Sequence, residues 1–203
     1  QNAPLFSGME KKLLRKSPCA TLILRDKLFG QSAVGVAIDA PSENDHEHQL
    51  LNDSLIRQAV TLAQFVGDKT IHLNHAWQGS DAALFLDPSV GLSPAEVKRS
   101  VDEWEINRRE WLDKLTDQAR DQYADHGMTF TSQLQMGPAH SAIVEAAESK
   151  KLAALVVATI NRTGLAGLFI GNTAEGLIDS APCSVLVVKP EGAQGLLTSL
   201  LTR

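Results

Sequence analysis

Two kinds of hydrophobic pattern alternate along the chain. Short, nearly continuous apolar runs are typical of strands covered on both faces, whereas apolar residues at every third or fourth position are typical of amphipathic helices. Apolar runs predict strands at residues 33–38 and 152–158, and a last strand is predicted at 184–189. Residues 70–76 have strand character, and 128–134 alternate as a strand does, so five strands are predicted. Helical spacing lies between them, at residues 50–66, 94–125, 138–151 and 174–180. This order predicts an α/β fold with a doubly wound, five-stranded parallel sheet of the Rossmann-like kind.

The start of the longest helix is strongly marked. Ser93 suits the N-cap, Pro94 the first helical position and Glu96 the third residue of a capping box. The apolar positions of this helix are Val97, Val101, Trp104, Trp111 and Leu115. Because they recur at helical spacing, they predict a core or interface stripe rather than an aromatic cage for a ligand.

A short unit occurs twice, at residues 4–27 and 167–191. Each copy has Leu-Phe-x-Gly, then a Pro-Cys pair, then an apolar run with a basic residue at its end. In the alignment, residues 18–19 match 182–183 and residues 22–25 match 186–189. The repeat predicts the end of a preceding domain at 1–29 (a helix–strand remnant), a domain at 30–192 and a tail at 193–203. The alternative is a chance similarity between two short helix–strand units.

Composition excludes several classes of partner. Hydrophobic residues make up 43% of the chain, which is enough for a core, and the formal net charge is -5 with no strongly basic stretch. Nucleic acid and acidic membrane surfaces are therefore not expected partners. No apolar run reaches the length of about 20 residues that spans a bilayer. Cys19 and Cys183 each begin an apolar run, which predicts two buried thiols in a reducing cytoplasm.

Asp39 follows the first strand of the predicted domain. Doubly wound sheets bind ligands beyond the carboxyl ends of their strands, at the point where strand order reverses. A carboxylate there can accept a hydrogen bond from a ribose hydroxyl or an adenine amino group. The alternative, which the residues leave open, is a turn-forming aspartate.

The loop after the fourth predicted strand is a second candidate site. Gly171 permits close backbone approach, Asn172 and Thr173 lie where a helix N-terminus offers N–H groups to a phosphate, and Arg162 adds a positive charge. In the alternative interpretation, Asn172 caps the helix with Glu175 at its third position. Both can hold together, because caps and phosphate sites use the same N–H groups.

This loop resembles that of the universal stress proteins, and in particular their tandem, E-type members. The similarity rests on residues 162–164, 171–175 and 182–190 and extends over 33–192. It implies an adenine nucleotide alpha hydrolase-like fold and a Gly-x2-Gly-x9-Gly-Ser/Thr loop that wraps the phosphates and ribose of ATP. Here that pattern falls on Ala158, Asn161, Gly171 and Asn172, so only the last glycine is kept. Asp39 matches the adenine-side aspartate, and Ala76, which follows the histidine of the second strand, is the next position of the implied site.

The resemblance also implies pairing through the last strand, across a homodimer or between tandem domains. Residues 21–25 are expected to lie antiparallel to residues 185–189, or to their copy in another chain, which would shield a sheet edge. The residues concerned are Thr21, Ile23 and Arg25 in the first segment and Val185, Val187 and Lys189 in the second.

The remaining polar candidates predict no catalytic or metal site. His46 and His48 lie in an acidic stretch that fits a solvated loop, and their spacing matches no closed zinc pattern. His72 and His75 have opposite parity in a strand and so face different sides of the sheet, with His75 in a packing role. No Walker loop or nucleophile elbow occurs, so the chain is not expected to be an enzyme. A slow ATPase would rest on the fold alone.

Two functions stay open at this point. One is a non-enzymatic stress-response domain that binds ATP, AMP or a related ligand. The other is a degenerate domain that serves dimerisation or domain assembly, because the methyl group of Ala158 and the side chain of Asn161 intrude where the family's backbone lies against ribose and phosphate.

Overall fold

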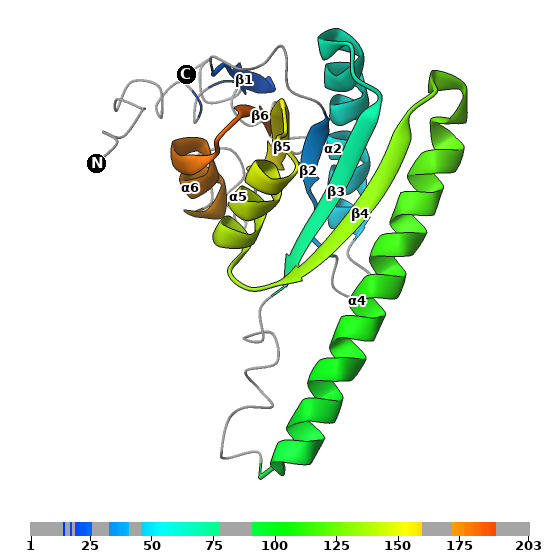
Figure 1. Ribbon diagram of the computed structural model, residues 1–203, viewed down its shortest axis with the longest axis vertical. Coiled ribbons are helices and arrows are strands. Elements are labelled where there is room, and N and C mark those ends of the chain that lie inside the picture. The colour runs from blue at the N-terminus through cyan, green and yellow to red at the C-terminus, as the bar shows by residue number, and fades with distance from the viewer. Residues whose placement is uncertain are drawn as a thin grey trace, which may run out of the picture.

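The computed structural model describes residues 19–25, 33–40, 46–77, 91–159 and 172–189, together with the single positions Leu14 and Ser17. Its strands are β1 (Thr21–Ile23), β2 (Val34–Ala37), β3 (Thr70–Trp77), β4 (Thr129–Met136), β5 (Ala154–Ala158) and β6 (Ser184–Val188). Its helices are α2 (His46–Val66), α4 (Pro94–Gln122), α5 (Ala139–Ser149) and α6 (Asn172–Ser180), with the 3-10 turn η2 at Ala124–His126. Strands and helices alternate as the hydrophobic pattern predicts (Figure 1).

All these strands join one sheet, in the order β1-β6-β5-β2-β3-β4 (Figure 1). The strands from β2 to β6 are parallel to their neighbours, whereas β1 runs antiparallel to β6. The expectation of five strands was therefore wrong, since the sheet has six, one of them antiparallel. β1 joins because its backbone groups pair with the outer edge of β6, which is the kind of edge that proteins tend to cover.

The β1–β6 pair has a definite register within one chain. Thr21 lies opposite Val187, Leu22 opposite Leu186 and Ile23 opposite Val185. This is the antiparallel orientation that the sequence led us to expect for these segments. That residues 1–29 are the end of a preceding domain stays a prediction.

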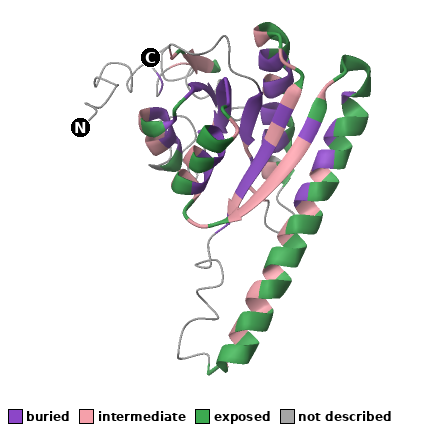
Figure 2. Ribbon diagram, viewed as in Figure 1, coloured by how far each residue is buried: buried purple, intermediate pink, exposed green. Residues whose placement is uncertain are grey.

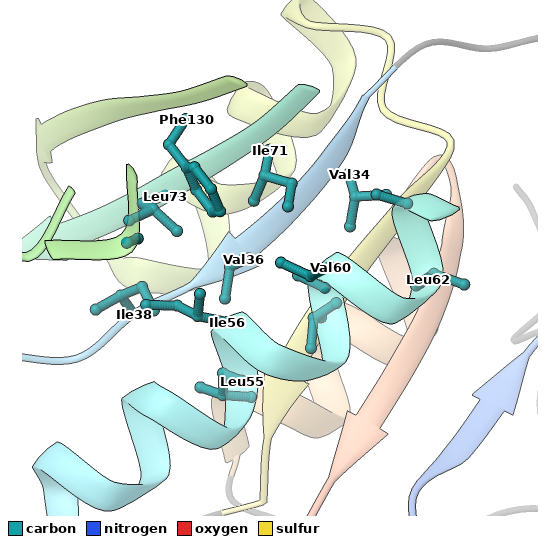
Figure 3. Close-up of a cluster of buried hydrophobic side chains, with 14 of the residues drawn as sticks. Val34, Val36, Ile38, Leu55, Ile56, Val60, Leu62, Ile71, Leu73 and Phe130 are labelled. Atoms are coloured by element: carbon teal, nitrogen blue, oxygen red, sulfur yellow. The ribbon is translucent and has the colours of Figure 1, made fainter. Parts of the chain in front are cut away.

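Helices cover the sheet on both faces. α2 and α4 pack on one face, where their apolar side chains meet those of the central strands; ten residues of this cluster are labelled in Figure 3. α5 and α6 pack on the other face, with Ile143, Leu177 and Ile178 against Leu155 and Val185. Most residues of β2, β5 and β6 are buried, β3 is buried in part, and the helices are buried on one side only (Figure 2). This three-layer arrangement is the one expected for a doubly wound sheet.

β2 approaches its neighbour on the α5–α6 face closely at Gly35. A Cβ atom at this position would lie 2.3 Å from Leu152 Cδ1 and 3.2 Å from Leu155 Cδ1. A larger residue here would therefore require the Leu152 side chain to move, so glycine is favoured at this position by packing rather than by its backbone freedom.

α4 is longer than its contact with the sheet requires. It has 29 residues, begins with the expected capping box, in which Ser93 and Glu96 bond each other reciprocally, and buries only Leu112, Thr116 and Ala119. Its N-terminal half extends past the end of the sheet (Figure 1). In the predicted stripe, Trp111 and Leu115 pack on the core, while Val97, Val101 and Trp104 are only half-buried. In the part of the chain described, no helix is both long and apolar enough to cross a membrane.

Candidate functional site

The carboxyl ends of β2 and β5 meet at the point where strand order reverses. The two strands are parallel neighbours, with Val36 opposite Val156. α2 follows β2 on one face of the sheet, and α6, the next described helix after β5, lies on the other face. The two helices lie on opposite faces of the sheet. In this architecture, ligands bind beyond the strand ends at such a point.

Three of the candidate residues lie together at this edge. Asp39 follows β2, and Ala158 is the last residue of β5. The β2–β3 register pairs Ala37 with Asn74, so two residues further on Ala76 lies beside Asp39. Asp39 and Ala158 are half-buried, and the Asp39 carboxylate makes no hydrogen bond to any residue that the structure describes. The carboxylate is thus free, within these residues, to accept a donor from a ligand.

The backbone before Asp39 is held from two sides. Asn52 of α2, which is 4% exposed, donates from Nδ2 to the Asp39 carbonyl at 2.8 Å. The Ile38 N–H donates to the Asn74 carbonyl at 2.9 Å, and His75 Nδ1 lies 3.0 Å from the Ile38 carbonyl oxygen. These contacts hold the backbone from which the Asp39 side chain projects.

Sequence reasoning did not single out Asn52. Its only signal was an amide one turn before the buried Leu55 and Ile56, inside the apolar stripe of α2. A polar residue at such a position must find a partner, and here the partner is the backbone of the strand end.

On the β5 side, the strand continues into Thr159, which is buried. Its N–H donates to the Val188 carbonyl at 2.9 Å, so β5 stays paired with β6 one residue beyond Ala158. The methyl group of Ala158 therefore belongs to a firmly held strand end. Asn161, Arg162 and Gly171 lie outside the described residues, so their predicted roles stay predictions.

α6 begins at Asn172 and has nine residues. Thr173 is exposed in the first turn, and Glu175 is half-buried in the same turn. The first N–H groups of an α-helix have no partner inside the helix and can bind an anion. The capping interpretation placed Asn172 just before the helix. The helix instead begins at Asn172, one residue earlier than that interpretation assumed.

A shallow hollow beside Ala76 is not a ligand pocket. It lies between α5 and the strands β3 and β4 and is lined by residues that include Ala76, Gln135 and Ala146, but it has no room for a water molecule. The candidate site is therefore the edge between β2 and β5, not this hollow.

The histidines divide as their parity predicted. His75 is buried on the α4 face and meets the Trp111 ring edge to face, with 5.4 Å between ring centroids. His72 lies on the other face, where its Nδ1 is 2.5 Å from Thr131 Oγ1; burial, followed by the charge of Lys150, lowers the pKa of His72.

The expectation that His46 and His48 lie in a loop was wrong. His46 and His48 belong to the first turn of α2, not to a loop, because a polar turn can extend a helix outward without needing core contacts. Within the described ranges, no group of three or more His, Cys, Asp or Glu residues could hold a metal ion.

Cys183 is buried and Cys19 is exposed, and both are free, so the prediction of two buried thiols fails for Cys19. Cys183 precedes β6, which has a neighbour on each side, whereas Cys19 precedes the short edge strand β1. Burial raises the pKa of Cys183 to about 11.

Comparison with known proteins identifies the family. The model of the Universal stress protein family matches residues 34–189, which span the sheet from β2 to β6. The chain belongs to the universal stress protein family.

Similar proteins carry the same name. "Universal stress protein E" of Photorhabdus laumondii is 26% identical over 195 residues, covering 93% of this chain and 57% of that protein. "Universal stress protein E" of Escherichia coli K12 is 27% identical over 194 residues, covering 95% of this chain and 58% of that protein. The chain thus spans a little over half the length of these universal stress proteins.

Solved structures agree on the fold. A crystal structure from Pseudomonas aeruginosa UCBPP-PA14, of a protein assigned to the universal stress proteins, has a TM-score of 0.69 at 27% identity and covers 98% of this chain and 63% of that one. A universal stress protein from Archaeoglobus fulgidus has a TM-score of 0.52 at 19% identity, covering 78% and 93%, and shows the fold alone.

Proposed function

We propose that this universal stress protein domain binds an adenine nucleotide, ATP or AMP, at the sheet edge between β2 and β5, and acts in the stress response without catalysing a reaction. The observation that carries the proposal is that Asp39 and Ala158 lie at the carboxyl ends of two neighbouring parallel strands, β2 and β5. The N-terminal turn of α6, the next described helix after β5, supports it. An acidic acceptor and a set of free N–H groups are the two features that a nucleoside phosphate needs at its two ends.

Each residue has a distinct task in this proposal. The Asp39 carboxylate accepts a hydrogen bond from the adenine amino group or a ribose hydroxyl, with Asn52 holding its backbone in place. The N–H groups at Asn172 and Thr173, with Gly171 before them, bind phosphate, and Arg162 supplies positive charge. Ala76 contributes a small side chain beside the adenine.

Ala158 and Asn161 set the affinity. Both stand where the family's loop pattern has glycine, so each places a side chain against the ribose and phosphate. We therefore expect binding weaker than a fully glycine-bearing loop would give, not a different kind of ligand.

The test is to extract the purified protein with acid and to analyse the supernatant by mass spectrometry. A stoichiometric adenine nucleotide, present as purified or after incubation with millimolar ATP, supports the proposal. The Asp39→Asn variant should lose it, whereas Asp125→Asn, which changes an exposed carboxylate in η2, should retain it. An empty extract after incubation contradicts the proposal.

A second function, domain assembly, is favoured by the β1–β6 pair. Thr21 and Ile23 of β1 lie opposite Val187 and Val185 of β6 and cover the edge of that strand. Residues of a preceding tandem domain, or of a second copy, would cover the edge in the same way. On this view residues 1–29 are the end of a preceding universal stress domain in a tandem protein, and residues 30–192 are the domain that follows it. The two free cysteines fit a cytoplasmic location for it.

Two variants test the assembly function. Ile23→Asp puts a charge into the partly buried face of β1, releases the β6 edge and should raise the mass measured by light scattering as copies pair through β6. Leu24→Asp, at a side chain that is 65% exposed, is the control and should leave the mass unchanged. An unchanged mass in both variants would contradict the assembly function, because the β6 edge would then not pair with another copy when β1 is released.

A further inference from the structure

The β1–β6 pair is symmetric in a way that the repeat explains. Leu22 pairs with Leu186, which is the residue that matches it in the second copy. Thr21 pairs with Val187 and Ile23 with Val185, so exchanging the two copies maps the pairing onto itself. The two copies are therefore related by a local two-fold axis, the geometry of a self-complementary contact.

A basic side chain from each copy crosses this axis. Arg25 donates from Nη2 to the carbonyl oxygens of Ile178, at 2.8 Å, and Asp179, at 3.3 Å. Lys189, which matches Arg25 in the repeat, donates from Nζ to the Ser17 carbonyl. Each basic side chain thus binds backbone oxygens that precede the strand of the other copy.

The contact made by Arg25 meets a need of α6. The last carbonyl groups of a helix have no partner inside it, and a cation near them is favourable. α6 has no basic residue in its own last turn. Arg25, two residues after β1, supplies the missing donor and charge, and the Arg25 N–H also donates to Ser184 Oγ at 3.0 Å.

In the proposed function, the first turn of α6 binds the phosphate of the ligand. The helix is short, at nine residues, so one end cannot shift without moving the other. Short helices owe most of their stability to such tertiary contacts. Arg25 at one end and the ligand at the other therefore act on the same element.

We infer that Arg25 is a positioning residue for the ligand site: by holding the C-terminal end of α6, it makes the order of that helix depend on β1 being docked at the sheet edge. One consequence is that β1 docking and ligand binding stabilise each other, and this consequence rests on the proposed function. Such coupling is reciprocal, since each favours the same ordered state of α6.

Hydrogen–deuterium exchange of the whole chain tests this inference. In Arg25→Met, which keeps an unbranched side chain but removes the guanidinium, amides of residues 174–180 should exchange about tenfold faster, equivalent to about 1.4 kcal/mol. Arg25→Lys should fall between this variant and the unmodified protein, because an ammonium still donates to a carbonyl. ATP at about 100 times its measured Kd should slow α6 exchange about a hundredfold in every variant that binds it.

The control is chemically matched. Arg120 also binds a backbone carbonyl through its guanidinium, that of Phe130 at 2.8 and 3.2 Å, but at the opposite edge of the sheet. Arg120→Met should leave α6 exchange unchanged. β3 serves as the internal standard for global opening.

Faster exchange in α6 alone supports the inference. Unchanged α6 exchange in Arg25→Met, or an equal rise in α6 and β3, overturns it, because the effect would then be absent or global. If the unmodified protein binds no ATP, the proposed function fails, while the exchange of α6 in Arg25→Met against Arg120→Met still decides the role of Arg25.

Discussion

The hydrogen bond from Asn52 to the Asp39 backbone gives a sharp test of how the strand end is held. Asn52 is 4% exposed, and its Nδ2 lies 2.8 Å from the Asp39 carbonyl oxygen. Asn52→Ala removes the donor and leaves a small void, which should cost about 1–3 kcal/mol of unfolding free energy. Asn52→Asp keeps the shape but places a carboxylate against a carbonyl oxygen in a buried position, where an unpaired charge costs about 3–5 kcal/mol. The isosteric change should therefore be the more damaging one.

The two variants also differ in their dependence on pH. Burial without a partner raises the pKa of the introduced carboxyl above its unfolded value of about 3.9. The unfolded state then releases the proton more readily, so the destabilisation is full above the folded pKa and disappears as pH falls towards the unfolded one. Relative to the parent protein, Asn52→Asp should recover stability between pH 7 and pH 4.5, and Asn52→Ala should not.

Urea denaturation at the two pH values, followed by circular dichroism, measures these differences. Asp53→Asn is the control, since it alters an exposed carboxylate at the next position and should change stability by no more than about 0.5 kcal/mol. A variant Asn52→Asp as stable as Asn52→Ala at pH 7, or one indifferent to pH, would refute the view that this amide acts as a buried donor.

The other predictions concern the ligand edge, the sheet and the thiols. Ala158→Gly removes the methyl group at the end of β5 and should tighten ATP binding about tenfold by calorimetry; weaker binding would mean that this methyl group does not obstruct the ligand. Gly35→Ala would bring a Cβ to 2.3 Å from Leu152 Cδ1 and should cost about 1–3 kcal/mol in urea denaturation, where an unchanged midpoint would contradict the packing argument. At pH 8, a thiol reagent should label Cys19 quickly and Cys183 only on unfolding, since burial raises the pKa of Cys183 to about 11; equal labelling rates would show that Cys183 is accessible.

The strands of the sheet could be predicted from sequence because their signal is local. The strands β2 and β5 are buried on both faces and have nearly continuous apolar sequences, at Val34–Ala37 and Ala154–Ala158. The edge strand β4 is instead marked by an alternating pattern. The start of α4 could also be predicted from the sequence, since Ser93 and Glu96 form their capping box within a single turn. The antiparallel place of β1 was implied by the family resemblance, after the repeat had identified the segment, and not by a local pattern.

What the sequence did not reveal depends on contacts between distant segments. The bond from Asn52 to Asp39 joins α2 to a strand end, and that from Arg25 to Ile178 spans most of the chain. No periodicity encodes such pairs. The exposure of Cys19 was missed for a related reason, since whether an apolar run is covered depends on its place in the sheet.

Isothermal titration calorimetry with ATP tests the central claim most directly. The account predicts saturable, one-to-one binding to the unmodified protein, lost in Asp39→Ala and retained in Asp125→Ala, with circular dichroism confirming that all three are folded. Absence of binding to the unmodified protein, or equal binding by Asp39→Ala, would contradict a nucleotide site at the edge between β2 and β5.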